Sequence, residues 1–135
     1  MKSLIFERVM QTAVLGATLA GAPLTAHAEI KNYEFQLVQP TVQAGGDRIV
    51  TVRLVDKTTG KPVPDAVIFA TRLDMAPDSM QEMVTKVTPL PSSEPGVYQF
   101  KANLSMAGGW QLSLGAKIQG ETGSLENKLV LKAVP

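Results

Sequence analysis

The chain has 135 residues, no cysteine, and 13 basic against 12 acidic side chains, for a formal net charge of +1. The lack of cysteine excludes disulfides and thiolate metal sites. A near-neutral charge without a polybasic run argues against nucleic acid as a partner.

The first 28 residues have the three-part layout of a secretory signal peptide. An apolar stretch over residues 9–24 precedes Ala26-His-Ala28, a small-x-small cleavage site. The stretch is short for a membrane span and contains polar residues, although an uncleaved N-terminal anchor is the alternative. We therefore predict a cleaved signal peptide over 1–28 and a single periplasmic domain over 29–135 that is not attached to the membrane. His27, the only histidine, would leave with the signal.

The pattern after Glu29 is one of strands. Apolar and polar residues alternate in short stretches, and clusters of Gly, Pro, Asp and Ser separate them. Because no long amphipathic helix competes, the pattern predicts an all-β, immunoglobulin-like β-sandwich of about seven antiparallel strands. The expected strands cover residues 32–37, 49–55, 66–73, 83–87, 97–104, 110–118 and 125–134.

Three local expectations follow from the same pattern. Residues 43–47 form a turn cluster. In the third strand, Val67, Phe69, Thr71 and Leu73 are expected to share one face. Residues 79–82 carry a capping box, which is typical of the first turn of a helix.

The methionines are the candidate functional residues. Three fall in one polar segment, as Met75, Met80 and Met83, and Met106 precedes a glycine pair. Thioether sulfur is soft and uncharged, so it suits Cu(I) or Ag(I). Methionine is also a common filler of irregular space in cores, and both interpretations stay open.

The predicted topology places these methionines at the same end of the sandwich. In an immunoglobulin-like sandwich, successive connections alternate between the two ends, so the third-to-fourth and fifth-to-sixth connections lie at the same end. Asp74, Asp78 and Glu82 would then add a carboxylate ligand or solvate the loop. Trp110 would cover a metal by a cation–π contact or anchor the core, and the core interpretation is favoured.

The order of three sequence blocks resembles that of a known family. These blocks are Gly60-Lys-Pro-Val-Pro-Asp-Ala-Val67, Gly96-Val-Tyr98 and Leu104-Ser-Met-Ala-Gly-Gly-Trp110, and the methionine-bearing loop lies between the first two. They resemble the YtkA-like/FixH-like periplasmic domain over residues 36–134. The resemblance implies an immunoglobulin-like sandwich and a non-enzymatic accessory role in copper handling, beside a copper efflux or oxidase-assembly protein. It also implies metal ligands at Met75, Met80, Met83 and Met106.

Three functional hypotheses follow. The first is a periplasmic Cu(I)- or Ag(I)-binding carrier or buffer without an organic cofactor. The second is a metal-free interaction module that uses a methionine-rich contact loop or an exposed strand edge. The third, an enzyme, is disfavoured because no histidine or cysteine remains after residue 28 for base or nucleophile chemistry.

Overall fold

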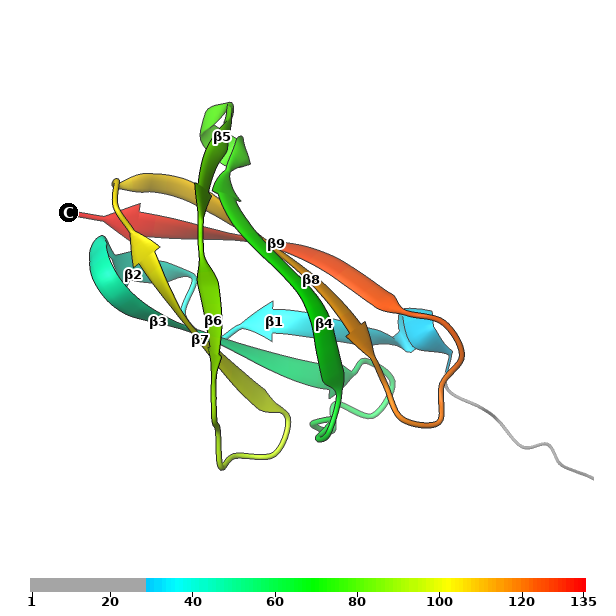
Figure 1. Ribbon diagram of the computed structural model, residues 1–135. Coiled ribbons are helices and arrows are strands. Elements are labelled where there is room, and N and C mark those ends of the chain that lie inside the picture. Colours follow the sequence, from blue (N-terminus) through cyan, green and yellow to red (C-terminus); the bar gives the residue numbers. More distant parts are fainter. Residues whose placement is uncertain (1–28) are drawn as a thin grey trace, which may run out of the picture.

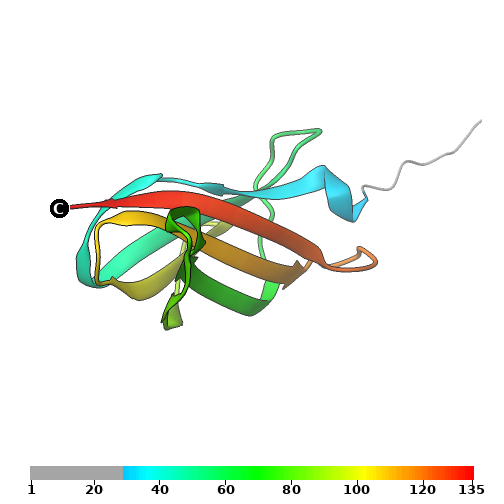
Figure 2. The same cartoon turned by 90° about the horizontal axis from the view of Figure 1, so that it is seen from above.

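Two β-sheets face each other in the computed structural model, which describes residues 29–135 (Figure 1; Figure 2 gives the view from above). The predicted signal peptide over 1–28 lies outside the described residues. After a short 3-10 turn, η3 (Ile30–Asn32), the chain enters the first sheet. The four-stranded sheet has the order β1 (Tyr33–Leu37), β3 (Gly45–Asp56), β7 (Val97–Leu104), β6 (Val87–Leu90), and the five-stranded sheet has the order β2 (Thr41–Gln43), β9 (Leu125–Val134), β8 (Gly108–Lys117), β4 (Val67–Met75), β5 (Met80–Thr85).

The core lies between the sheets because the long strands alternate apolar and polar residues. One face of each strand is therefore buried, and its neighbours in sequence point outward. All the pairings are antiparallel except β2 with β9, which is parallel. This arrangement confirms the predicted all-β immunoglobulin-like sandwich. The buried residues of the central strands include Val50, Val52, Leu54, Phe100, Ala102, Leu104, Trp110, Leu112, Leu114, Ala116, Leu131 and Ala133.

The strand count differs from the prediction because the chain crosses between the sheets at both lateral edges. Pro40 lies between β1 in one sheet and β2 in the other, and Lys86 lies between β5 and β6 in the same way. The expected strand over 83–87 is thus divided into β5 and β6, and β2 is an additional strand after the expected first one, as happens where strands change sheets at the corners of a sandwich. The structure accordingly has nine strands in residues 29–135 rather than about seven. The expected turn cluster over 43–47 is also mostly strand, since β3 begins at Gly45.

The expected shared face of β4 is wrong in its first half. The pairing of β4 with β8 shifts register between Ile68 and Ala70, which is the mark of a β-bulge. Thr71 and Leu73 share the inward face, but Val67 and Phe69 are 60% and 54% exposed. Strict alternation cannot anticipate the extra residue, so the prediction failed upstream of the bulge.

The expected helical turn over 79–82 is also wrong. A 3-10 turn, η4 (Ala76–Asp78), comes earlier, and β5 begins at Met80. Pro77 suits the first turn of such an element, and Ser79 adopts a left-handed conformation with φ of 61°. The backbone therefore reverses at Ser79 and enters a hairpin instead of continuing as a helix.

Tyr33 leads to a prediction about stability at high pH. Its hydroxyl donates a hydrogen bond of 2.7 Å to Oε2 of Glu121. This bond, together with partial burial, raises the pKa of Tyr33 from 10.0 to about 12. Because the folded-state pKa lies above the ordinary value, the stabilisation is complete below pH 10 and is lost as the pH rises toward 12. We expect the free energy of unfolding to fall over this interval.

The measurement is an ultraviolet titration of tyrosinate combined with urea unfolding at each pH. The chain has two tyrosines, so Tyr33→Phe assigns the signal. Glu121→Gln should return the pKa of Tyr33 toward 10.0 and flatten the stability profile. An unchanged titration in this variant would contradict the role given to the Glu121 bond.

Candidate functional site

Two methionine-bearing connections meet at one end of the sandwich. The first is the β4–β5 connection with η4, which projects at the top of Figure 1, and the second is the β7–β8 turn. The backbone N–H of Gly109, at the start of β8, donates a 3.1 Å hydrogen bond to Oδ2 of Asp78 in η4. The expected proximity of these connections is therefore confirmed. We call this end, with Met75, Met80, Met83 and Met106, the methionine pole.

The four methionines differ in exposure. Met75 ends β4 and is 0% exposed, so it is part of the core. Met80 is its cross-strand partner at the start of β5 and is half-buried. Met83 is also half-buried against the core. Met106, in the β7–β8 turn, is 41% exposed. The structure pairs Met75 with Met80, and the predicted role of all four as metal ligands stays a prediction.

Gly108 allows the end of the Met75 side chain to approach the β7–β8 turn. Its φ is +140°, a conformation that residues with a Cβ rarely adopt. A Cβ at this position would lie 2.9 Å from Cε of Met75 and would collide with Oδ2 of Asp78. The thioether end of Met75 therefore packs against the backbone two residues after Met106.

Trp110 lies in the core, the interpretation that the sequence favoured. It is 1% exposed, and its indole Nε1–H donates a 3.0 Å hydrogen bond to the carbonyl oxygen of Met106. A buried indole N–H requires such a partner. The bond also holds the backbone of the turn that carries Met106. Trp110 therefore acts on the methionine pole through the main chain.

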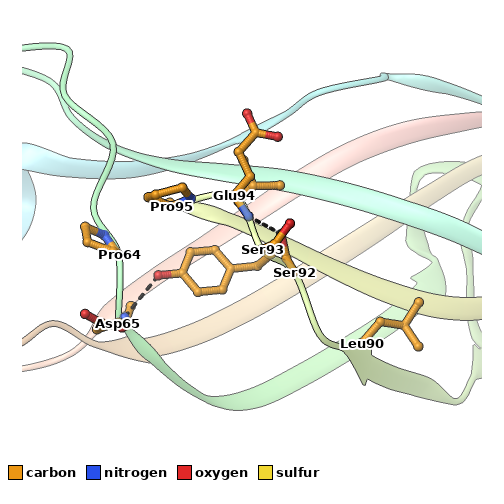
Figure 3. Close-up of a pocket in the computed structure, with 11 residues that line it drawn as sticks. Pro64, Asp65, Leu90, Ser92, Ser93, Glu94 and Pro95 are labelled. Carbon is orange, nitrogen blue, oxygen red and sulfur yellow. Dashed lines mark hydrogen bonds between the residues drawn. The ribbon is translucent and has the colours of Figure 1, made fainter.

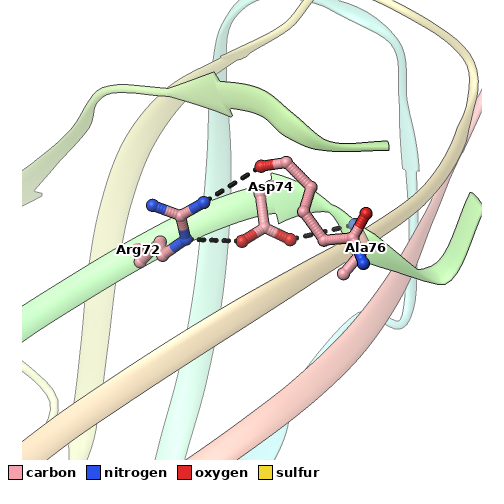
Figure 4. A network of polar contacts seen from close by, with 4 residues as sticks. Arg72, Asp74 and Ala76 are labelled. Atoms are coloured by element: carbon pink, nitrogen blue, oxygen red, sulfur yellow. Dashed lines mark hydrogen bonds and ion pairs between the residues drawn. The ribbon is translucent and has the colours of Figure 1, made fainter. Parts of the chain in front are cut away.

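The loop carboxylates support the hairpin. Asp74 is buried, and its Oδ2 lies 2.6 Å from Nε of Arg72 (Figure 4). Its Oδ1 accepts a 2.9 Å bond from the backbone N–H of Ala76, which begins η4. Arg72 also donates to the carbonyl oxygen of Gln81, across the hairpin in β5, at 3.0 Å. The sequence pattern placed Asp74 in a loop. Its i, i+2 spacing from Arg72 puts the two side chains on one face of a strand, and this spacing could have predicted their ion pair.

Oxygen and nitrogen ligands do not gather around this end. In the part of the chain that the structure describes, no group of three or more His, Cys, Asp or Glu side chains could hold a metal ion. Asp78 is bonded to Gly109, and Glu82 is exposed. The same residues include no helix that is long and apolar enough to cross a bilayer.

The fold and the methionine pole define a small immunoglobulin-like domain in which two connections are hydrogen-bonded to each other at one end. The chain belongs to the YtkA-like family, whose model matches residues 27–115. No curated protein matches the chain.

Three solved structures are similar in fold. The Lin-41 filamin domain is 17% identical with a TM-score of 0.44, and the match covers 80% of this chain and 95% of that one. The ZirS C-terminal domain is 12% identical with a TM-score of 0.45, over 100% and 94% of the two chains. The structure of the Escherichia coli adhesin FdeC is 14% identical with a TM-score of 0.40, and the match covers 85% of this chain and 33% of that one.

Proposed function

We propose that the protein is a periplasmic accessory protein that binds Cu(I) or Ag(I) through thioether sulfur at the methionine pole, and that it acts by binding and not by catalysis. The observation that carries this proposal is the bond between Gly109 and Asp78, which holds the two methionine-bearing connections against each other. Membership of the YtkA-like family supports an accessory role. A partner of the copper efflux or oxidase-assembly class, which supplies or receives the metal, is part of the proposal.

The burial of each methionine indicates the role that it would have as a metal ligand. Met75 is enclosed and would form the inner ligand, whereas Met106 and the half-buried Met80 would receive the ion from solvent. Thioethers carry no charge and no proton, so metal affinity would not titrate near neutral pH. Met83 lies within the register shift between β4 and β5, where it has no partner residue on β4, and it packs against the core, so we expect it to contribute least.

The test is a Cu(I) titration under anaerobic conditions, in competition with a coloured Cu(I) chelator. The same titration with Ag(I) is followed by NMR of protein labelled at the methionine methyl carbons. We expect one equivalent of metal to shift the methyl signals of Met75, Met80 and Met106, with a smaller shift for Met83. Replacing all four by leucine should weaken binding by about 100-fold or more, because no soft ligand then remains in the described chain.

Leucine is a suitable replacement because the Met-to-Leu exchange conserves volume and costs less than about 1.5 kcal/mol per site. Urea unfolding of each variant shows whether the fold survives. Met106→Leu and Met83→Leu form a matched pair, and only the first should reduce affinity clearly. Equal metal binding by the four-leucine variant would overturn the proposal and favour a metal-free contact role for the loop.

A further inference from the structure

The outer side of β4 is unpaired over most of its length. β5 pairs only with Leu73–Met75 of β4, after which the chain crosses at Lys86 to the other sheet. Residues Val67–Arg72, apart from the bulged Phe69, pair with β8 on one side, and no strand of residues 29–135 pairs with them on the other. We call Val67–Arg72 the open edge of β4. Such an edge presents backbone N–H and C=O groups in the spacing that an added strand requires.

The open edge carries no proline and no charge before Arg72, and its one protective feature is the bulge between Ile68 and Ala70. Residues 67–71 are Val-Ile-Phe-Ala-Thr, with neither charge nor proline. Proteins commonly protect edges with charged residues, with proline or with very short strands. Here β6 contains Pro89, β2 has three residues, and the stretch of β9 that extends beyond β2 carries Glu126 and Lys128. Val67 and Phe69 are exposed apolar side chains at this edge, and an added strand would remove part of their surface from water.

A groove runs along the open edge between the two sheets. A cavity of about 190 Å³ is lined by Ile68 of β4, Pro89 and Leu90 of β6, and Tyr98 of β7, among others. A second cavity of about 590 Å³, drawn in Figure 3, shares Ala66, Leu90 and Tyr98 with it, so the two cavities adjoin. We call these two adjoining cavities the β4–β6 groove. Side chains on one face of an added strand would point into it, and those on the other face would lie over Val67 and Phe69.

The floor of the groove is held in place by Tyr98. Its hydroxyl donates a 2.8 Å bond to the carbonyl oxygen of Val63 and accepts a 3.0 Å bond from the N–H of Ala66. These bonds fix the loop that leads into β4. A groove that is already ordered costs less conformational entropy when it is filled.

The groove is acidic at one end. Asp65 and Glu94 line the larger cavity, and the eleven lining residues include no basic side chain (Figure 3). Both carboxylates are exposed, and neither forms an ion pair within residues 29–135. This charge favours a lysine or arginine on the occupant at the end near Asp65.

We propose that the open edge of β4 binds an extended peptide segment of a partner protein as an added β-strand. The segment places alternate apolar side chains in the β4–β6 groove and a basic residue beside Asp65 and Glu94. Main-chain hydrogen bonds provide affinity, and the groove and its carboxylates provide selectivity. The contact lies on the half of β4 that is remote from Met75 and does not depend on metal.

The probes are two capped heptapeptides of alternating valine and threonine, one with lysine at its N-terminus and one with lysine at its C-terminus. Two orientations are needed because either strand direction satisfies the edge. Binding is followed by amide shifts in NMR of the purified metal-free protein. We expect one peptide to shift Val67–Arg72 and Leu90, and to bind about tenfold more tightly than its glutamate counterpart. N-methylation of alternate peptide amides should abolish binding, because it removes the donors that face the edge.

A matched pair of variants locates the contact. Val67→Lys places a charge on the open edge and should weaken binding about tenfold or more. Val130→Lys places the same charge on β9, at a valine with a similar exposure of 57%, and should leave the affinity unchanged. Asp65→Asn with Glu94→Gln should remove the preference for lysine. Asparagine tolerates the positive φ of 64° at residue 65.

Three outcomes would overturn the proposal. They are amide shifts that map away from the open edge, equal binding of the N-methylated peptide, and Val130→Lys as damaging as Val67→Lys. A fourth outcome, a molecular mass that rises with protein concentration and returns to the monomer value in Val67→Lys, would mean that a second copy of the chain occupies the edge.

Discussion

Replacing Gly108 with alanine should lower the free energy of unfolding by about 3 kcal/mol and separate the two connections of the methionine pole. The φ of +140° strains any residue with a Cβ. The added methyl group would also meet Cε of Met75 at 2.9 Å and collide with Oδ2 of Asp78. Relief of this clash moves η4 away from β8. If the two connections share a metal, Cu(I) affinity should therefore fall with stability.

Gly120→Ala is the matched control for this substitution. Gly120 also has a positive φ, +84°, but a Cβ there would have nothing within 4 Å. Gly120→Ala should lower the free energy of unfolding by about 1 kcal/mol through backbone strain alone and leave metal binding unchanged. Urea unfolding and the Cu(I) competition titration measure both effects. If Gly108→Ala is no more damaging than Gly120→Ala, the close packing of Met75 and Asp78 against the turn is not important for stability.

Replacing Trp110 with alanine should cost about 4 kcal/mol, the typical range for removing a large aromatic side chain from a core. Trp110 is 1% exposed and packs between the sheets in β8. Because it is the only tryptophan, its fluorescence cannot be used in the variant, and unfolding should be followed by circular dichroism. A loss below about 2 kcal/mol would be inconsistent with its place in the core.

Trp110→Phe separates the packing of the ring from its hydrogen bond. Phenylalanine keeps most of the apolar volume but leaves the carbonyl oxygen of Met106 without its 3.0 Å donor. We expect a smaller loss of stability, about 1–2 kcal/mol, together with a change in the methyl signal of Met106. A shift of the Met106 signal without metal would show that the indole N–H positions the β7–β8 turn.

Strand positions in the middle of the sandwich could be predicted from the sequence because their apolar residues alternate without interruption. Val50, Val52 and Leu54 in β3 and Leu112 and Leu114 in β8 are buried as the pattern predicted. These segments have neighbouring strands on both sides, so a period of two is preserved over Val50–Leu54 and Leu112–Leu114. The fold class followed directly from them.

The lateral strands were predicted less well. Val67 and Phe69 were expected to share a face with Thr71 and Leu73, but the bulge between Ile68 and Ala70 turns them outward. The change of sheet near Pro40 and Lys86 depends on which sheet offers a partner, and this is a property of the assembled sandwich. Both features arise from pairing between distant segments, which local periodicity does not record.

The candidate site divides in the same way. The sequence by itself determined which residues could bind a soft metal, because the choice of ligand chemistry depends only on residue type: thioethers, with no thiol in the chain and no imidazole after residue 28. Only the tertiary structure decided that Met75 is enclosed while Met106 is exposed. It also decided that Asp74 supports the β4–β5 hairpin and that Asp78 binds this hairpin to the β7–β8 turn. The physical reason is that burial and hydrogen bonding between residues such as Asp78 and Gly109, 31 positions apart, exist only after the two sheets have packed.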